Sequence, residues 1–223
     1  MNVPPNNPWL DLPDAPPFVA PVDAEVVDRC IGGLKDKCEL RLDLRPQPWT
    51  GSVATAEVLV LALNPGFHPD DLLDVRNPDY AEQWRLALSF STRTPFYFLD
   101  PVFRQTGGGR WWHKRVRELI EAAGFDAVSR GLMCVEHFPY KSTRYAALGE
   151  TLPSQQYSLT IVREAIRSDK PIVIMRSEHI WRESVPELRE YPYIRLSNHQ
   201  NPYLNRAQMT NEQFERVVAA MRG

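Results

Sequence analysis

Polar side chains that could bind a ligand or take part in catalysis follow three short hydrophobic runs of this sequence. Asn64 comes directly after VLVLAL, Glu136 directly after LMCV, and His199 lies in SNHQNPYLNR after YIRL. An amide can hold a water molecule, a carboxyl can bind the polar edge of a ligand, and an imidazole can donate a hydrogen bond. If the runs are parallel strands, the three tails meet at one edge and predict a ligand site there, although such tails also occur in domains that only bind.

The elements that must position these side chains alternate along the chain. Apolar residues at helical spacing predict helices at 22–38 (ended or interrupted near Gly32–Gly33), 79–89, 110–123, 157–170, 177–185 and 210–222. Hydrophobic runs predict strands at 58–63, 132–138, 171–175 and 193–197. This alternation predicts a three-layer α/β/α sandwich with a central four-stranded parallel sheet.

The chain is expected to divide into an N-terminal extension (1–56) packed on an α/β domain (57–223). The proline-rich residues 1–21 predict an extended arm, with Trp9, Leu10 and Phe18 as its anchors. The run GGG before Arg110 predicts a turn that is either a flexible clamp or a mobile loop.

Composition narrows the class of protein. The 223 residues are 43% hydrophobic and 24% charged, with a net charge of -2, as in a globular protein without a global basic field. A local basic patch would still suffice for DNA. The three cysteines form no CxxC pair, so we expect no disulfide, metal or cofactor. Reduced thiols and the lack of a signal or membrane segment predict a cytoplasmic monomer that does not associate with membranes.

Four segments together resemble the motifs of the uracil-DNA glycosylase superfamily, in the family's order, over residues 57–222. LALNPG resembles the first motif in its Asn-Pro-Gly version, and TPFYFLDP resembles the segment that supplies an aromatic platform. GLMCVEHFPYKSTR resembles the strand that reads the base, and HQNPYLNR the second motif. The resemblance implies a glycosylase fold and an enzyme that flips a base out of DNA and hydrolyses its N-glycosidic bond, leaving an abasic site.

The resemblance also implies roles for the first and last motifs. Asn64 would position the attacking water, while Pro65 and Gly66 end the strand and let the backbone approach the nucleotide. His199 would donate a hydrogen bond to the departing base, and Asn198 would take that role if the register differs by one residue. The non-catalytic alternatives are an Asn that caps a turn and a His satisfied within its loop.

The remaining implied roles concern the base and the DNA. Phe98 would stack on the base, with Phe96 and Tyr97 as rivals for the same role; core packing is the alternative for these rings. A wedge at Tyr203–Leu204 would fill the gap left by the flipped base. Asn201 is a further candidate for binding the base. Arg206, Lys141 and Arg144 are candidates for contacts with phosphate.

Glu136 stands where uracil-removing members commonly carry an Asn. An ionised carboxylate only accepts hydrogen bonds, so it would oppose O4 of uracil and favour the N4 amino group of cytosine. This predicts a cytosine-type target, with or without a 5-substituent. A protonated Glu136, or a register that brings in His137, would serve uracil instead; a surface salt bridge is the non-functional alternative.

Three functions stay open at this stage. No Lys occupies the place of a nucleophile, so a glycosylase would be monofunctional, acting in repair or in defence against foreign modified DNA. Gln200 and Asn201 depart from the second motif, and the first motif carries no carboxylate, which permits a non-catalytic sensor of damaged or modified DNA. A hydrolase of free nucleosides is the third possibility.

Overall fold

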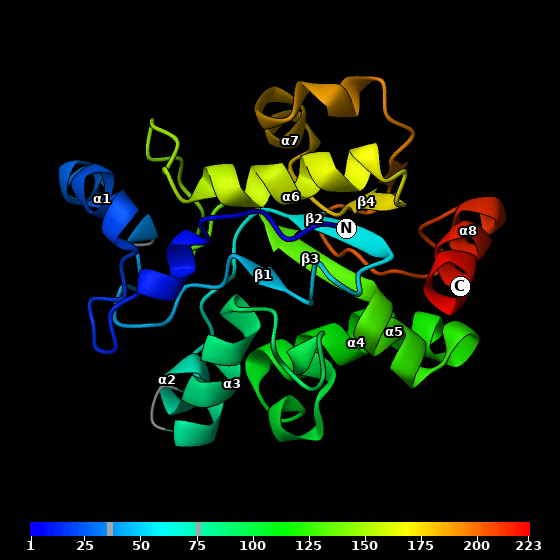
Figure 1. Ribbon diagram of the computed structural model, residues 1–223, viewed down its shortest axis with the longest axis horizontal. Helices are drawn as coiled ribbons and strands as arrows, with labels where there is room; N and C mark the ends of the chain where they lie inside the picture. The colour runs from blue at the N-terminus through cyan, green and yellow to red at the C-terminus, as the bar shows by residue number, and fades with distance from the viewer. Residues whose placement is uncertain (35–37, 75–76) are drawn as a thin grey trace.

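A computed structural model describes residues 1–34, 38–74 and 77–223 as an α/β protein around one five-stranded sheet (Figure 1). The strands are β1 (Trp49–Thr50), β2 (Val58–Ala62), β3 (Leu132–Glu136), β4 (Ile172–Ile174) and β5 (Ile194–Arg195). Their order is β1-β3-β2-β4-β5; β1 is antiparallel to β3, and all other pairs are parallel. The four predicted parallel strands are confirmed, but the prediction of a four-stranded sheet is wrong because it missed β1.

The sheet is buried on both faces, which explains the continuous hydrophobic runs. Along β2, Leu59 and Leu61 belong to one core, while Val58 and Val60 belong to the other. The first core is covered by α6 (Gln155–Arg167) and the second by α4 (Gly107–Ala123) and α8 (Asn211–Arg222). Figure 1 shows α6 and α4 on opposite sides of the sheet.

Most of the predicted helices are present. The other α-helices are α1 (Ala24–Ile31), α2 (Asp71–Asp74), α3 (Pro78–Leu88), α5 (Phe125–Gly131) and α7 (Glu178–Ser184). Short 3-10 turns are η1 (Pro8–Asp11), η2 (Pro21–Asp23), η4 (Tyr97–Leu99), η5 (Pro101–Phe103) and η6 (Pro186–Arg189). The helix expected within 22–38 ends at Ile31 with Gly32 as its C-cap, which confirms the predicted end near Gly32–Gly33. Residues 35–37 of that range lie outside the described residues. No helix in the described ranges is long and apolar enough to cross a membrane.

The N-terminal segment is built into the core of the molecule. Trp9 and Phe18 are buried as expected, whereas the third predicted anchor, Leu10, is 59% exposed. The buried Asp23 carboxylate accepts hydrogen bonds from the Tyr140 hydroxyl at 2.8 Å and from the Ser154 hydroxyl at 2.6 Å. These bonds attach the segment to the loops that follow β3.

The glycine run 107–109 forms the first turn of α4, so the prediction of a turn or mobile loop there is wrong. Thr106 caps the helix by accepting a hydrogen bond from Gly109 N at 2.9 Å. A Cβ at Gly108 would lie 2.2 Å from the Phe98 ring, and one at Gly109 would lie 1.9 Å from Phe103 O. The glycines are therefore required because the helix packs directly against the aromatic segment 96–103.

Candidate active site

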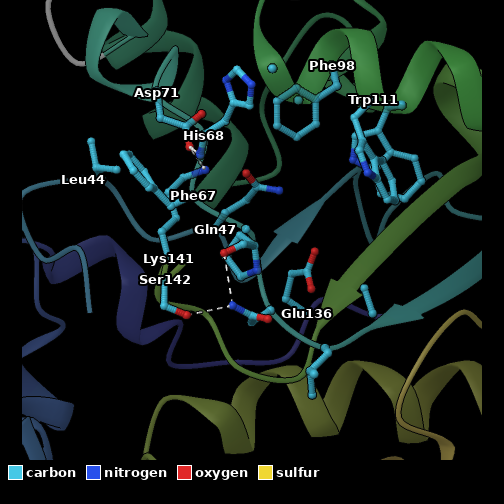
Figure 2. A pocket seen from close by; sticks show the side chains of 18 of the residues that line it. Leu44, Gln47, Phe67, His68, Asp71, Phe98, Trp111, Glu136, Lys141 and Ser142 are labelled. Carbon is cyan, nitrogen blue, oxygen red and sulfur yellow. Dashed lines mark hydrogen bonds and ion pairs between the residues drawn. The ribbon is translucent and has the colours of Figure 1, made fainter. Parts of the chain in front are cut away.

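A cavity of about 720 Å³ lies beyond the carboxyl ends of β2, β3 and β4. It is lined by the segments that follow those strands, by the aromatic segment and the start of α4, by Tyr80 and Trp84 of α3, and by Leu44, Arg45 and Gln47. Figure 2 shows side chains from these segments facing a common space. This is the position at which a parallel sheet offers a ligand site. The polar tails after β2 and β3 lie at the cavity as predicted, whereas the third cavity wall comes from the segment after β4, and the predicted tail after β5 contributes only Pro202.

Asn64 lines the cavity in a fixed orientation. Its amide nitrogen donates to the Ser142 hydroxyl at 3.2 Å and to Pro65 O at 3.3 Å (Figure 2). Pro65 and Gly66 line the same wall, and Gly66 pairs with Ser142 in an isolated bridge. Because the two bonds occupy the amide nitrogen, the carboxamide oxygen stays available to accept a hydrogen bond from water.

Glu136 provides a buried carboxyl at the same edge of the sheet. The residue is 6% exposed, and its Oε2 atom is buried without a hydrogen-bond partner among the described residues. Burial raises the pKa of Glu136 from 4.5 to about 8, although the positive charges of Lys141 and Arg176 oppose the rise. The carboxyl is therefore mostly neutral at pH 7 and can both donate and accept a hydrogen bond.

The neutral state changes which base edges the Glu136 carboxyl can recognise. The preference for cytosine rested on an ionised carboxylate, which only accepts. A neutral carboxyl can donate to N3 of cytosine while accepting from its N4 amino group, and it can equally donate to O4 of uracil while accepting from N3–H. The geometry therefore supports recognition of a pyrimidine edge without choosing between the two bases. His137 takes no part in the cavity lining, because its Nε2 lies 2.8 Å from the Ser184 hydroxyl.

Phe98 is one of the two predicted stacking rings that the structure places at the cavity. It lines the wall together with Tyr97, and Figure 2 shows its ring near the Trp111 side chain of α4. Phe96 is fully buried and packs edge-on against Trp112 at a centroid distance of 4.8 Å. The base-binding role predicted for Phe96 is therefore wrong, since its ring belongs to the core.

The second motif lies largely outside the cavity. Of residues 199–206, only Pro202 is part of the lining. His199 is exposed, and its Nε2 lies 3.2 Å from an Arg195 nitrogen. Asn201 is exposed and accepts a hydrogen bond from Arg115 at 3.3 Å. Neither of these two predicted site residues is part of the cavity lining.

The predicted wedge and the predicted phosphate contact at Arg206 are only partly compatible with the structure. Leu204 is 0% exposed, which contradicts its role as an inserting residue, whereas Tyr203 is partly exposed beside the Arg115 guanidinium. Arg206 is not a free cation: it pairs with Glu118 at 3.0 Å and with Glu215 at 2.8 Å. Its predicted contact with phosphate would require these bonds to break.

The other two predicted phosphate contacts, Lys141 and Arg144, lie at the cavity. Lys141 lines it and pairs with Asp71 at 3.3 Å, while the exposed Arg144 lines it without an ion pair to a described residue. Arg176 also lines the cavity and donates to Gln200 O at 3.1 Å. The sequence analysis did not single out Arg176, although its position directly after the strand at 171–175 was a signal for a site role.

Gln47, Trp111 and Ser142 are lining residues that the sequence did not single out. Gln47 precedes β1, a two-residue strand without a recognisable pattern, so nothing in the sequence marked it. Ser142 lay inside the segment quoted for the third motif. No group of three or more His, Cys, Asp or Glu side chains among the described residues is arranged to hold a metal ion.

Comparisons with known proteins give no further guide to the site. No family model matches the sequence, and neither a curated protein nor a solved structure matches the chain. The family resemblance therefore stays a prediction that rests on the four motifs.

The buried carboxyl predicts a specific pH dependence of stability. The pKa of Glu136 is raised on folding, so its stability contribution is complete below about pH 4.5 and is lost as the pH rises to about 8. Glu136→Gln should therefore raise the free energy of unfolding by about 2–4 kcal/mol at pH 9 and change it little at pH 4. Denaturant unfolding at both pH values measures this.

The exposed Glu183 offers a matched control, because Glu183→Gln neutralises a solvated carboxylate on α7. It should change stability by less than about 0.5 kcal/mol at either pH. Equal effects of Glu136→Gln at pH 4 and pH 9 would contradict a neutral buried carboxyl.

Proposed function

We propose that the protein is a monofunctional DNA glycosylase that acts on a flipped pyrimidine nucleotide. The observation that carries the proposal is the buried, neutral carboxyl of Glu136, whose Oε2 atom has no hydrogen-bond partner among the described residues, in a cavity that also presents the Phe98 ring and the oriented Asn64 amide. A planar base needs a ring to stack on and a group that both donates and accepts along its edge. Hydrolysis needs a placed water, which the Asn64 oxygen can hold.

The reaction follows from these positions. The base lies against Phe98 with its polar edge at Glu136, and the water held by Asn64 faces C1′ of the sugar. The C1′–N bond breaks as the water oxygen bonds to C1′, and the bonding electrons leave with the base. The proton lost by the water passes to solvent, and the departing base anion takes up a proton from solvent, so that the products are an abasic sugar with a C1′ hydroxyl and the neutral free base. An amide is a weak base, so most of the acceleration must come from stabilising the departing base.

Arg176 is the cation that we assign to this stabilisation. It lines the cavity, and its charge already acts on Glu136. His199, which the resemblance implied for this task, lies exposed beside Arg195. Arg176 therefore takes the role of opposing the negative charge that develops on the base. Arg144, exposed at the cavity, is positioned to contact a phosphate.

The position of His199 also favours a second candidate function. A protein that binds a flipped base without cutting needs the ring and the edge reader, but it needs no donor for a departing base. Such a sensor would bind modified or damaged DNA through the same cavity and release no base.

Mass spectrometry of free bases released from DNA tests the proposal. Wild-type protein should release a pyrimidine base and leave abasic sites, and Asn64→Ala should slow release in single-turnover assays by about 100-fold or more. The matched control is Asn211→Ala, which removes an exposed amide at the start of α8 and should leave the rate unchanged. Tight DNA binding without release by the wild type would favour the sensor instead.

Tyr203 provides the test for a nucleic-acid substrate. It is the partly exposed residue of the predicted wedge, since Leu204 belongs to the core. Tyr203→Ala should slow base release from duplex DNA by about tenfold, because unstacking costs a few kcal/mol, and should affect single-stranded DNA less. If the variant acts normally on duplex DNA, the wedge role is wrong; if free nucleosides are hydrolysed as fast as DNA, the protein is a nucleosidase.

A further inference from the structure

The cavity is larger than a pyrimidine base requires. A volume of about 720 Å³ falls within the range of pockets for drug-sized ligands. In the proposed complex the base fills the part at Phe98 and Glu136, and the deoxyribose fills the part at Asn64. A base that stacks on Phe98 and reaches Glu136 occupies the part of the cavity near the strand ends. The cavity continues past that part, between residues that the proposed reaction does not use.

We call this remaining part the outer compartment and define it by six lining residues: Leu44, Arg45, Gln47, Trp84, Lys141 and Tyr145. Three of them come from the segment that leads into β1, so the N-terminal part of the chain builds one wall. The Trp84 indole is held by a hydrogen bond to Pro46 O at 2.7 Å. This wall is fixed by the same packing that forms the edge of the sheet.

Gln47 connects the outer compartment to the reader of the base. Glu136 N donates to Pro48 O at 2.9 Å, so the backbone that carries Gln47 runs beside the backbone that carries Glu136. Figure 2 shows both side chains pointing into the central space, with Leu44 and Lys141 on the other side of Gln47. On a pyrimidine, C5 is bonded to C4, whose substituent belongs to the edge that Glu136 binds. A group on C5 can therefore extend from the edge at Glu136 past Gln47.

The outer compartment offers donors, acceptors and ring faces. The Gln47 amide both donates and accepts, and Trp84 and Tyr145 present aromatic surface. Asp71, which also lines the cavity, neutralises Lys141 at 3.3 Å and would repel an anionic group. The second cation of the compartment, Arg45, has its guanidinium over the Phe18 ring at 4.8 Å and the Trp84 ring at 5.7 Å. This lining suits a neutral substituent with several hydroxyl groups, whose C–H faces pack on rings and whose hydroxyls bond to amide and charged side chains.

We propose that the base recognised by this site carries a bulky, hydroxyl-rich substituent such as a sugar at C5, and that the outer compartment binds this substituent. The inference rests on the proposed function for the placement of the base. It assigns to Gln47 and Trp84 the selection of the substituent, and to Glu136 the recognition of the ring.

The test uses the full-length protein and duplexes that differ at one base: cytosine, 5-hydroxymethylcytosine, its glucosylated form, 5-carboxylcytosine and uracil. Both equilibrium binding and base release are measured for each duplex. The glucosylated base should be bound and released at least about tenfold better than cytosine or uracil. When a smaller base is bound, the polar groups of the compartment lack hydrogen-bond partners from the ligand, which weakens binding. The anionic 5-carboxylcytosine should gain no such preference.

Variants assign the preference to the compartment. Gln47→Leu should reduce the ratio of glucosylated to unsubstituted base by about tenfold, whereas Gln156→Leu, an exposed Gln on α6, should leave the ratio unchanged. Because the readout is a ratio within one variant, a partial loss of folded protein does not mimic the result.

The outcomes separate this inference from the proposed function. Release of cytosine or uracil at the same rate as the glucosylated base would overturn the inference and leave the glycosylase proposal standing. Preferred binding of the glucosylated duplex without release from any DNA would support the inference and overturn the glycosylase proposal. A preference for 5-carboxylcytosine would overturn the inference, since the compartment would then select negative charge.

Discussion

The parallel pairing of β2 with β3 is the interaction from which the candidate site follows. Ala62 lies opposite Glu136, and the pairing continues past the strands, because Phe138 N donates to Leu63 O at 2.8 Å. Both strands are buried, so a slip of one residue would turn every apolar side chain to the wrong face. The core therefore fixes the register, and the register brings Asn64 and Glu136 to one edge from distant parts of the chain.

The position of Glu136 has a cost that the fold alone does not explain. The Glu136 Oε1 atom has only the weak donor Cys134 Sγ at 4.0 Å, and the Oε2 atom has no hydrogen-bond partner among the described residues. Such a carboxyl destabilises the folded state, and it persists because it stays neutral. The chain surrounds it with groups that suit a ligand: the Phe98 ring, the Gln47 amide and the Arg176 charge. A buried polar atom without a hydrogen-bond partner is expected where a protein keeps polar groups ready for a bound molecule.

The sequence predicted the strands and helices whose positions follow from buried hydrophobic runs and from helical periodicity. The hydrophobic run at 58–63 predicted a strand that is present, and its polar end predicted one wall of the cavity. The two-residue strand β1 carries no such pattern, so Gln47 could not be placed. Leu204 and Arg206 looked available as single residues, but one is buried in the core and the other is held by two carboxylates. These are tertiary contacts, and local sequence does not encode them.

The most direct test of the central claim is the ionisation of Glu136 itself. NMR spectra of protein with ¹³C-labelled glutamate carboxyl groups, recorded across a pH series, would follow it, and Glu136→Gln would identify its resonance. The structure predicts a pKa for Glu136 of about 8 in the ligand-free protein. A Glu136 carboxyl that titrates near its ordinary value of 4.5 would be ionised at neutral pH and would contradict the neutral reader of the base edge.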